Sequence, residues 1–449
     1  MRRVALFALV AVLLAALVGT VTAQEGVTLV IWGEPGTVTC INENNTEDMG
    51  CIYALTLNEL WSETYPDITL QWEDHGWDAT LRQNLVTAQL GGTAPDITVG
   101  ESFMPELTRN GSFLPLDISE EAMNNIVPGT VAAVTHDGQV HGVAAFTAVF
   151  ALEVNADVVR AAGLDPDTID LSTWSKVSEA AAAINEAGAG EYHGFSILGP
   201  TNAPAAALFR AAPYVYQTGG DFCDEGCVNP TFNDPAAVPV YEWFRELYQY
   251  TPPGLAFNGD EGFVFSQLFA GETAMQTAGA WHPAWALGSG CEDCRYLPLP
   301  TPDEGGQRAN VVVGNAIYAA LASTEHPEEA MLFLEFLTND AVQSNNFWAN
   351  GRMPTTLSSL ESILAAAEGD TSNVPEYFEG DAVATAAPFV FYIDELFNGD
   401  VRTLPAWADE GPALDALWND MFAEVLTSDR PVQEILDDYQ AQAEALVAG

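Results

Sequence analysis

Basic side chains are scarce in this sequence. Its 449 residues include 13 lysines and arginines against 63 aspartates and glutamates, which gives a formal net charge of −50. Such a charge repels nucleic-acid phosphates and anionic lipid head groups, so neither is expected as a partner. Lys176 is the only lysine and follows a serine, so the G-x-x-x-x-G-K-[ST] loop that binds nucleotide phosphates is absent. The H-E-x-x-H and G-x-S-x-G motifs of metalloproteases and serine hydrolases are absent too.

What the chain does contain is typical of a folded globular protein. Hydrophobic residues make up 48% of it, aromatic residues 10% and charged residues only 17%. The length suffices for about two to three domains with a large buried core. The crowded carboxylates should repel one another more in the compact state than in the unfolded chain. We therefore expect raised pKa values for carboxyl groups of the folded protein, and stabilisation by salt.

Residues 1–23 have the parts of a secretory signal peptide. Two arginines precede an apolar run at 4–18, and Val21 and Ala23 fit the recognition positions before a cleavage site. We expect cleavage and export to the periplasm or the cell exterior. The alternative is an uncleaved segment that tethers the protein, because the apolar run approaches the ~18 residues of a short membrane span.

The six cysteines fall into three close pairs, Cys40 with Cys51, Cys223 with Cys227, and Cys291 with Cys294. An even number in an exported chain favours disulfides, and closeness in sequence favours these three pairings. The alternative is a zinc site made of four thiolates from the last two pairs. An oxidising compartment would compete for those thiols, so we expect three disulfides and no metal.

The pattern of apolar residues predicts alternating strands and helices. Residues 27–32 (VTLVIW) form a continuous apolar run, as in a strand that is buried on both faces. Further strands are expected at 68–72, 95–100 and 151–155, with helical stretches between the first three. This β-α-β-α-β order implies a parallel sheet with right-handed crossovers, so the fold class is α/β. Later helices are expected near 173–186, 235–250, 261–270, 326–338, 413–426 and 432–447.

Several sequence blocks occur in a recognisable order. They are LRQNLVTAQLGGTAPDITVGESFMPELTRNGSFLPLD at 81–117, HGVAAFTAVFALEVNADVVRAAGLDPDTIDLSTW at 141–174 and FSQLFAGETAMQTAGAW at 265–281, followed by LPLPTPDEGG, NAIYAALASTEHPEEAMLFLEFL and GRMPTT. In this order they resemble the extracellular solute-binding proteins of ATP-binding-cassette (ABC) importers, in the group typified by maltose-binding protein. The resemblance spans nearly the whole mature chain, apart from a stretch at about 361–401.

The resemblance implies a two-lobed periplasmic-binding-protein fold (type II-like), in which each lobe is a mostly parallel sheet flanked by helices. Crossing segments near 146–151 and 314–318 would join the lobes as a hinge, and the ligand cleft would lie between them. The implied lobes are 24–148 plus about 316–350 for lobe one, and 149–315 plus about 351–449 for lobe two.

The resemblance also indicates which side chains meet a ligand. Proteins hold sugars by stacking an aromatic ring on the apolar face of the sugar and aiming amides and carboxylates at its hydroxyls. Trp281 would form the cleft floor, whereas Trp77, Trp348 and Trp407 lie in loop-like stretches near Gly or Pro. Trp243, at an amphipathic helical position, is expected in the core. The expected ligand contacts are Trp281, Glu101, Trp32, Trp77, Trp407, Asn315, Trp348 and Glu34.

The expected function is therefore binding without catalysis or a cofactor. The protein would be a monomer that delivers a sugar or oligosaccharide to the permease subunits of an ABC importer by closing its cleft. Two alternatives stay open. One is a secreted carbohydrate-active enzyme, a glycosidase, for which two carboxylates would suffice. The other is a binding protein for a non-sugar solute such as a polyamine. Because arginine is scarce, anionic ligands that need bidentate clamps are disfavoured.

Overall fold

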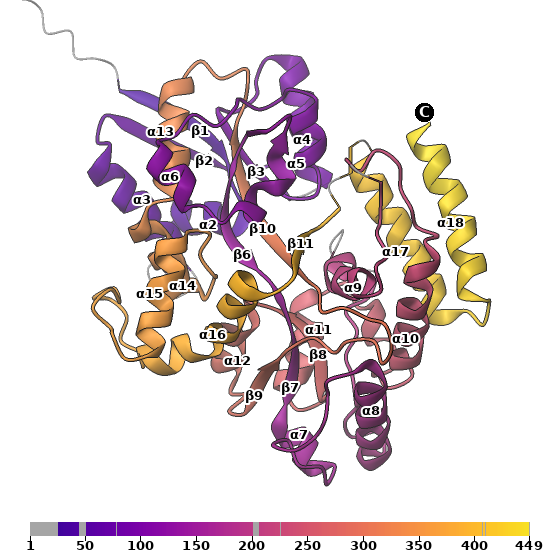
Figure 1. Ribbon diagram of the computed structural model, residues 1–449. Coiled ribbons are helices and arrows are strands. Elements are labelled where there is room, and N and C mark those ends of the chain that lie inside the picture. The colour runs from indigo at the N-terminus through magenta and orange to yellow at the C-terminus, as the bar shows by residue number, and fades with distance from the viewer. Residues whose placement is uncertain are drawn as a thin grey trace, which may run out of the picture.

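The computed structural model describes residues 26–44, 51–77, 79–200, 206–224, 226–405, 407–408 and 410–448. The predicted signal peptide, 1–23, lies outside these residues. Two α/β lobes lie one above the other, and strands β6 (Val143–Ala148) and β10 (Asn310–Ala320) run between them (Figure 1). Over the described ranges, none of the helices has the length and apolar character needed to cross a membrane.

The sheet of the upper lobe is mixed. Its order is β11-β10-β3-β1-β2, with β6 also paired to β10. Strand β1 runs parallel to β2 and β3, as the sequence pattern predicted, whereas β10 is antiparallel to β3 and β6. The remaining strands of this sheet are β1 (Val27–Trp32), β2 (Ile68–Glu73), β3 (Ile97–Gly100) and β11 (Val401–Thr403).

The sheet of the lower lobe differs from the prediction of a mostly parallel sheet. Its strands β7 (Phe150–Asn155), β8 (Met275–Gly279) and β9 (Cys294–Leu297) have the order β8-β7-β9, and both pairs are antiparallel. Parallel pairing beside this sheet is limited to isolated bridges such as that of Ser196 with Gln276 on β8. The neighbours of β7 come instead from more distant strands that run in the opposite direction.

Helices cover both sheets (Figure 1), and those expected near 173–186, 235–250, 261–270, 326–338, 413–426 and 432–447 are all present. In the first half of the chain they are α2 (Pro35–Glu43), α3 (Ile52–Thr64), α4 (Ala79–Gly91), α5 (Met104–Arg109), α6 (Glu120–Asn125), α7 (Ala156–Ala161), α8 (Trp174–Gly188) and α9 (Ala206–Gln217). In the second half they are α10 (Val238–Tyr248), α11 (Glu261–Phe269), α12 (His282–Ser289), α13 (Pro327–Leu337), α14 (Asp340–Asn350), α15 (Leu357–Ala367), α16 (Ala382–Asn398), α17 (Gly411–Thr427) and α18 (Val432–Val447). Short elements are η2 (Pro128–Val134), η3 (Pro235–Ala237), η4 (Leu255–Phe257), β4 (Thr135–His136) and β5 (Gln139–Val140).

The buried apolar side chains form two large clusters, one in each lobe. Along β6 the change from the upper to the lower cluster falls between Phe146 and Ala148. Along β10 it falls between Val313 and Ala316. Two strands therefore link two separate cores, which is the geometry that a hinge requires.

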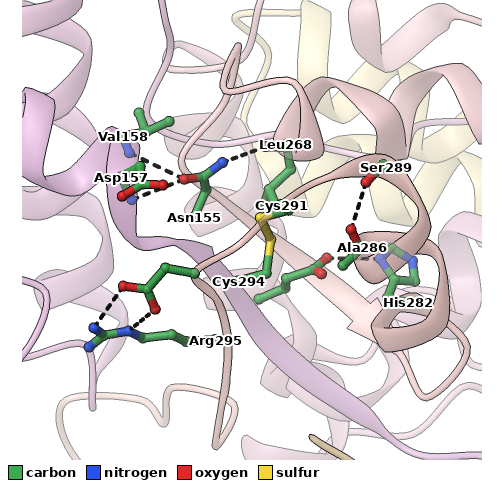
Figure 2. Close-up of a disulfide and its surroundings, with 12 residues drawn as sticks. Asn155, Asp157, Val158, Leu268, His282, Ala286, Ser289, Cys291, Cys294 and Arg295 are labelled. Carbon is green, nitrogen blue, oxygen red and sulfur yellow. Dashed lines mark hydrogen bonds and ion pairs between the residues drawn. A yellow bond between two sulfur atoms is a disulfide. The ribbon is translucent and has the colours of Figure 1, made fainter. Parts of the chain in front are cut away.

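The three disulfides are those predicted from the sequence: Cys40–Cys51, Cys223–Cys227 and Cys291–Cys294. They use all six cysteines, so none in the described chain is left to form a thiolate metal site. Figure 2 shows the third, which joins the segment after α12 to the start of β9. Nearby, the buried carboxylate of Glu153 lies 2.8 Å from Nδ1 of His282 at the beginning of α12.

The prediction of raised carboxyl pKa values is wrong for every described carboxyl group whose pKa is shifted. All of these pKa values are lowered, because nearby N–H, hydroxyl or guanidinium groups donate hydrogen bonds to the charged form. For Asp293 the pKa falls to about 2, chiefly through hydrogen bonds from Arg295. Local turn geometry thus outweighs general repulsion at these sites, which are Glu73, Asp165, Asp170, Asp224, Asp293, Asp303 and Asp370.

Candidate functional site

A cavity of about 70 Å³, which we call the first cavity, lies where the two lobes meet. The upper lobe contributes the turn after β3 and η2, the crossing strand β10 forms one wall, and α9, β11 and α17 contribute the rest. Three predicted site residues line this cavity together: Glu101, Asn315 and Trp407. They come from positions far apart in the sequence, so the fold brings together side chains that only the family resemblance could connect.

Glu101 holds the crossing strand. It follows β3 and its Oε1 accepts a hydrogen bond of 3.0 Å from the backbone N–H of Ala316 on β10. Ala316 has a φ of 46°, a left-handed conformation that costs free energy for a residue with a Cβ. Two residues earlier, a Cβ on Gly314 would lie 1.9 Å from the carbonyl oxygen of Thr130, so glycine is needed where η2 packs on β10. At least one oxygen of Glu101 is therefore used to hold β10 in its bent conformation at Ala316.

Asn315 supplies a buried hydrogen-bond donor that is not used within the described chain. Its side chain is 4% exposed, and Nδ2 has no hydrogen-bond partner among the residues that the structure describes. Buried polar groups without a partner are rare, because each costs about 1 to 3 kcal/mol. An oxygen atom of a ligand in the first cavity would satisfy this amide.

Trp407 is held in place by an acidic residue. Its Nε1–H donates a 2.8 Å hydrogen bond to Oδ1 of Asp415 on α17, and both residues are 3% exposed. The ring also packs edge-on against Phe232, with ring centroids 5.8 Å apart. The tryptophan N–H is therefore satisfied by the protein, and the ring supplies apolar surface to the cavity.

Two further residues of the first cavity were missed at the sequence level. Phe209, on α9, is only half-buried and lines the cavity, so part of its ring is available to a ligand. Asp415 lies on the buried face of α17 between Leu414 and Trp418. An acid inside the apolar stripe of an amphipathic helix is a signal that could have identified Asp415, whereas nothing local distinguishes Phe209 from a core residue.

Trp281 does not line the first cavity. It precedes α12, is 9% exposed, and packs edge-on against Phe150 at 6.2 Å between ring centroids. The guanidinium of Arg210 lies 5.6 Å from the Trp281 ring centroid and is paired with Glu261 at 3.0 Å. Burial lowers the pKa of Arg210. A role for Trp281 as cleft floor stays a prediction. Its ring contacts Phe150, which begins β7 directly after the crossing strand β6.

Trp32 and Trp77, which were also predicted to contact a ligand, belong to the upper lobe. Trp32 is 4% exposed, stacks on the ring of His75 at 3.7 Å, and donates from Nε1 to Glu73 at 3.1 Å. Trp77 is half-buried and packs against the upper core. Neither lines the first cavity, and their predicted contact with a ligand stays a prediction.

The prediction that Trp348 lies in a loop-like stretch is wrong. Trp348 lies in helix α14, is 6% exposed, and packs between Phe347 and Phe378. The nearby Gly351 marks the end of that helix, where it adopts a left-handed φ of 65° as the C-cap. Glycine near a tryptophan thus indicated a helix terminus and not a loop. Glu34, the last predicted contact, lines a second cavity beside the beginning of α2, together with Asn346 and Arg352.

No group of three or more His, Cys, Asp or Glu side chains in the described ranges is arranged to hold a metal ion. The first cavity offers one buried amide donor without a partner in the described chain, aromatic surface, and carboxylates that already accept hydrogen bonds from the protein.

Two α/β lobes joined by crossing strands beside a cavity are the architecture of a solute-binding protein. The chain belongs to the family of bacterial extracellular solute-binding proteins, whose family model matches residues 44–344. The family membership indicated by the sequence blocks is thereby confirmed.

Known relatives are distant in sequence. The lactose-binding protein of Rhizobium radiobacter is 24% identical over 333 residues, which cover 72% of this chain and 74% of that protein. An uncharacterized lipoprotein from the oleD 5' region of Streptomyces antibioticus is 23% identical over 286 residues, or 62% of this chain. The match covers 61% of that lipoprotein, less than two thirds of its length.

Solved structures share the fold over nearly the whole chain. An ABC transporter solute-binding protein from Thermotoga lettingae TMO, bound with α-D-tagatose, superposes with a TM-score of 0.72 at 18% identity. The superposition covers 94% of this chain and 100% of that chain. The predicted two-lobed α/β fold is confirmed.

Proposed function

We propose that this protein binds a neutral sugar or oligosaccharide in the first cavity and delivers it to the permease subunits of an ABC importer. The observation that carries the proposal is that one cavity is lined both by Asn315, whose Nδ2 donor has no partner in the described chain, and by the half-buried ring of Phe209. An amide that can donate to a hydroxyl, next to aromatic surface that can cover C–H groups, matches the two faces of a sugar. A lactose-binding relative and a tagatose-bound structural neighbour support the same class of ligand.

Ligand capture would proceed by closure of the lobes about β6 and β10. We propose the division predicted from the sequence, with 24–148 plus about 316–350 as lobe one and 149–315 plus about 351–449 as lobe two. The change of core cluster within β6 and β10 supports hinge positions there. On this proposal the protein is exported and acts as a monomer, and closure brings Trp281 against the ligand.

The protein would return its ligand unchanged. A glycosidase needs one carboxyl group to protonate the leaving group and a second to attack or to activate water. The two acidic residues that line the first cavity have other hydrogen bonds: Glu101 accepts from Ala316, and Asp415 accepts from Trp407. Incubation with a labelled oligosaccharide that binds tests this point, and release of shorter labelled products would contradict it.

A thermal-shift screen of the mature protein against monosaccharides, oligosaccharides, amino acids and polyamines tests the proposed ligand class. A ligand at 100 times its Kd stabilises the folded state by about 2.7 kcal/mol. We expect a neutral sugar to raise the melting temperature in wild type and much less in Phe209→Ala. Phe397→Ala is the matched control, because this ring is 40% exposed on α16 outside the cavity. Stabilisation by polyamines alone would refute the sugar proposal.

A further inference from the structure

A pair of ionisable side chains is buried beneath the start of α12. Glu153 lies on β7, His282 is the first residue of α12 (Figure 2), and both side chains are completely buried. Nδ1 of His282 lies 2.8 Å from Oε2 of Glu153. Among the described residues, no other basic side chain is within ion-pair distance of this carboxylate. Neither residue lines the first or the second cavity.

The hydrogen bonds around Glu153 favour its charged form. Gln276 stands opposite Glu153 in the pairing of β7 with β8, and its Nε2 donates a 2.7 Å hydrogen bond to Oε2. The other oxygen, Oε1, has no hydrogen-bond partner in the described chain. A proton on Oε1 would therefore lack an acceptor, whereas Oε2 accepts from both Gln276 and His282.

Two tyrosine hydroxyls also face this carboxylate, from Tyr296 on β9 and Tyr392 on α16. Burial raises the pKa of both hydroxyls, and the negative charge of Glu153 raises them further. Neither hydroxyl oxygen has a hydrogen-bond partner within the described ranges. Neutral phenols can turn their O–H groups toward Glu153, but only His282 can supply a compensating positive charge.

The imidazole of His282 lies among aromatic rings. The ring centroids of Phe265 and Trp285 are 4.2 and 6.0 Å from its own, and Nε2 is buried without a hydrogen-bond partner in the part of the chain that the structure describes. A lone pair on Nε2 would face no donor, whereas an N–H with positive charge is attracted by the π electrons of such rings. The surroundings of both ring nitrogens therefore favour the imidazolium form.

Arg210, on α9, is another cation near these rings. Its guanidinium lies 4.8 Å from the centroid of Phe265 and is paired with Glu261 on α11 at 3.0 Å. Because Arg210 has a carboxylate of its own, the charge of Glu153 is left to His282.

The buried pair also fixes the chain beside Trp281. Trp281 is the N-cap residue of α12 and directly precedes His282. Its ring folds back over the end of β8, where a Cβ on Gly279 would lie 2.4 Å from the ring. Attachment of His282 to β7 through Glu153 therefore holds the turn from which the Trp281 ring projects.

We propose that Glu153 and His282 form a buried ion pair, with the imidazole protonated on both nitrogens, and that this pair positions Trp281 for the ligand. Both are positioning residues, since they act through Trp281. The effect on the ligand rests on the proposed sugar binding, whereas the ion pair does not.

The ion pair is tested by nitrogen NMR of the mature protein with isotope-labelled histidine, without ligand, at pH ~7.5, where an ordinary histidine is mostly neutral. The two nitrogens of an imidazolium have similar chemical shifts, whereas those of a neutral ring lie far apart. His282→Gln identifies the signals by their loss. We expect an imidazolium in wild type and a neutral ring in Glu153→Gln. A neutral His282 in wild type would overturn the proposal, and this result does not require any variant to fold.

The positioning of Trp281 has a readout that needs no ligand. Its indole N–H signal, identified by its loss in Trp281→Phe, should shift in Glu153→Gln. Asp96→Asn is the matched control, because Asp96 is a buried carboxylate of the upper lobe, 9% exposed, that accepts a hydrogen bond from the N–H of Val30. The Trp281 signal should not move in this control. An unchanged signal in Glu153→Gln would refute the positioning role.

Titration calorimetry then measures the effect on the sugar found in the screen. Glu153→Gln should bind it at least ~5-fold more weakly, the equivalent of one net hydrogen bond, whereas Asp96→Asn should bind it like wild type. Equal affinity in Glu153→Gln and wild type would contradict the role of the pair in binding. Failure of every sugar to bind wild type would refute the proposed function alone, since both NMR readouts are taken without ligand.

Discussion

The two cavities on either side of β10 differ in how their charges are used. In the first, Glu101 and Asp415 accept hydrogen bonds from Ala316 and Trp407, and the open polar atom is the neutral amide of Asn315. In the second, Arg352 has no acidic partner in the described chain, and Glu34 faces the same space. A cavity whose charges are satisfied by the protein suits a neutral ligand, whereas the second cavity keeps an arginine without a carboxylate partner among the described residues.

The largest expected effect is that of replacing Trp281, which the sequence predicts as the floor of the ligand cleft. Trp281→Ala should weaken sugar affinity by ~30-fold to 1000-fold, since burial and stacking of such a ring contribute roughly 2 to 4 kcal/mol. Titration calorimetry with the sugar found in the screen measures this.

Trp243→Ala is the control for Trp281→Ala. Trp243 is 5% exposed, stacks on Trp174 at 5.0 Å, and donates from Nε1 to the carbonyl oxygen of Trp174. Its loss should destabilise the fold by about 3 to 5 kcal/mol and leave the affinity of the folded protein similar. If both variants lose stability and keep affinity, Trp281 is a core residue and the first cavity binds its ligand without it.

A second pair of variants separates a ligand-facing amide from a structural one. Asn315→Ala should weaken sugar binding ~5-fold to 150-fold, the equivalent of a lost hydrogen bond of about 1 to 3 kcal/mol, with little loss of stability. Asn310→Ala should do the reverse, because Asn310 donates to the carbonyl oxygen and accepts from the N–H of Phe150 at 2.7 and 3.0 Å. Titration calorimetry with the sugar and thermal melts of both variants distinguish the two roles. A strong stability loss in Asn315→Ala would mean that its amide serves the fold.

Outside the cavities, paired charges should contribute measurable stability that depends on pH. Arg295 and Arg160 lower the pKa of Asp293 to about 2, below the usual value of about 3.9. A lowered folded-state pKa stabilises the protein above the unfolded-state pKa, and this contribution disappears as pH falls through about 2. Asp293→Asn should therefore cost about 1 kcal/mol near neutral pH, since the pair is partly screened by water. The difference from wild type should shrink between pH ~4 and 2, and a pH-independent difference would contradict this explanation.

The smallest expected effect is that of salt. Although individual carboxyl pKa values are lowered by local hydrogen bonds, the net charge of −50 still opposes the compact state over longer distances. The melting temperature at neutral pH should rise from low salt to ~0.5 M salt. A flat response would mean that the acids are dispersed well enough for repulsion to be negligible.

Local sequence signals predicted the first strands and several of the long helices, but not helices such as α9, α14 and α16. The apolar run at 27–32 forms β1 with those bounds, and the helix expected at 432–447 is α18. The antiparallel sheet of the lower lobe was not predictable in this way. Strand β7 pairs with residues 275–279 and 294–297, and no local pattern encodes the direction of so distant a partner.

The candidate site was predictable only in part. The resemblance selected Glu101, which follows the end of β3 at the cavity, and Asn315, which lies in the middle of the crossing strand β10. Phe209 and Asp415 reach the same cavity from helices α9 and α17, and only tertiary packing places them there. Conversely, Trp348 has the composition of a binding residue but is buried by its neighbours on and beside α14.

The most direct test of the central claim is hydrogen–deuterium exchange of the mature protein with and without the sugar found in the screen. If the sugar occupies the first cavity, backbone amides at 128–134 and 401–405 should exchange more slowly when it is bound, because η2 and β11 line that cavity. Amides at 36–40 and 346–352, beside the second cavity, should change less. Protection confined to 36–40 and 346–352 would place the sugar in the second cavity and contradict the account.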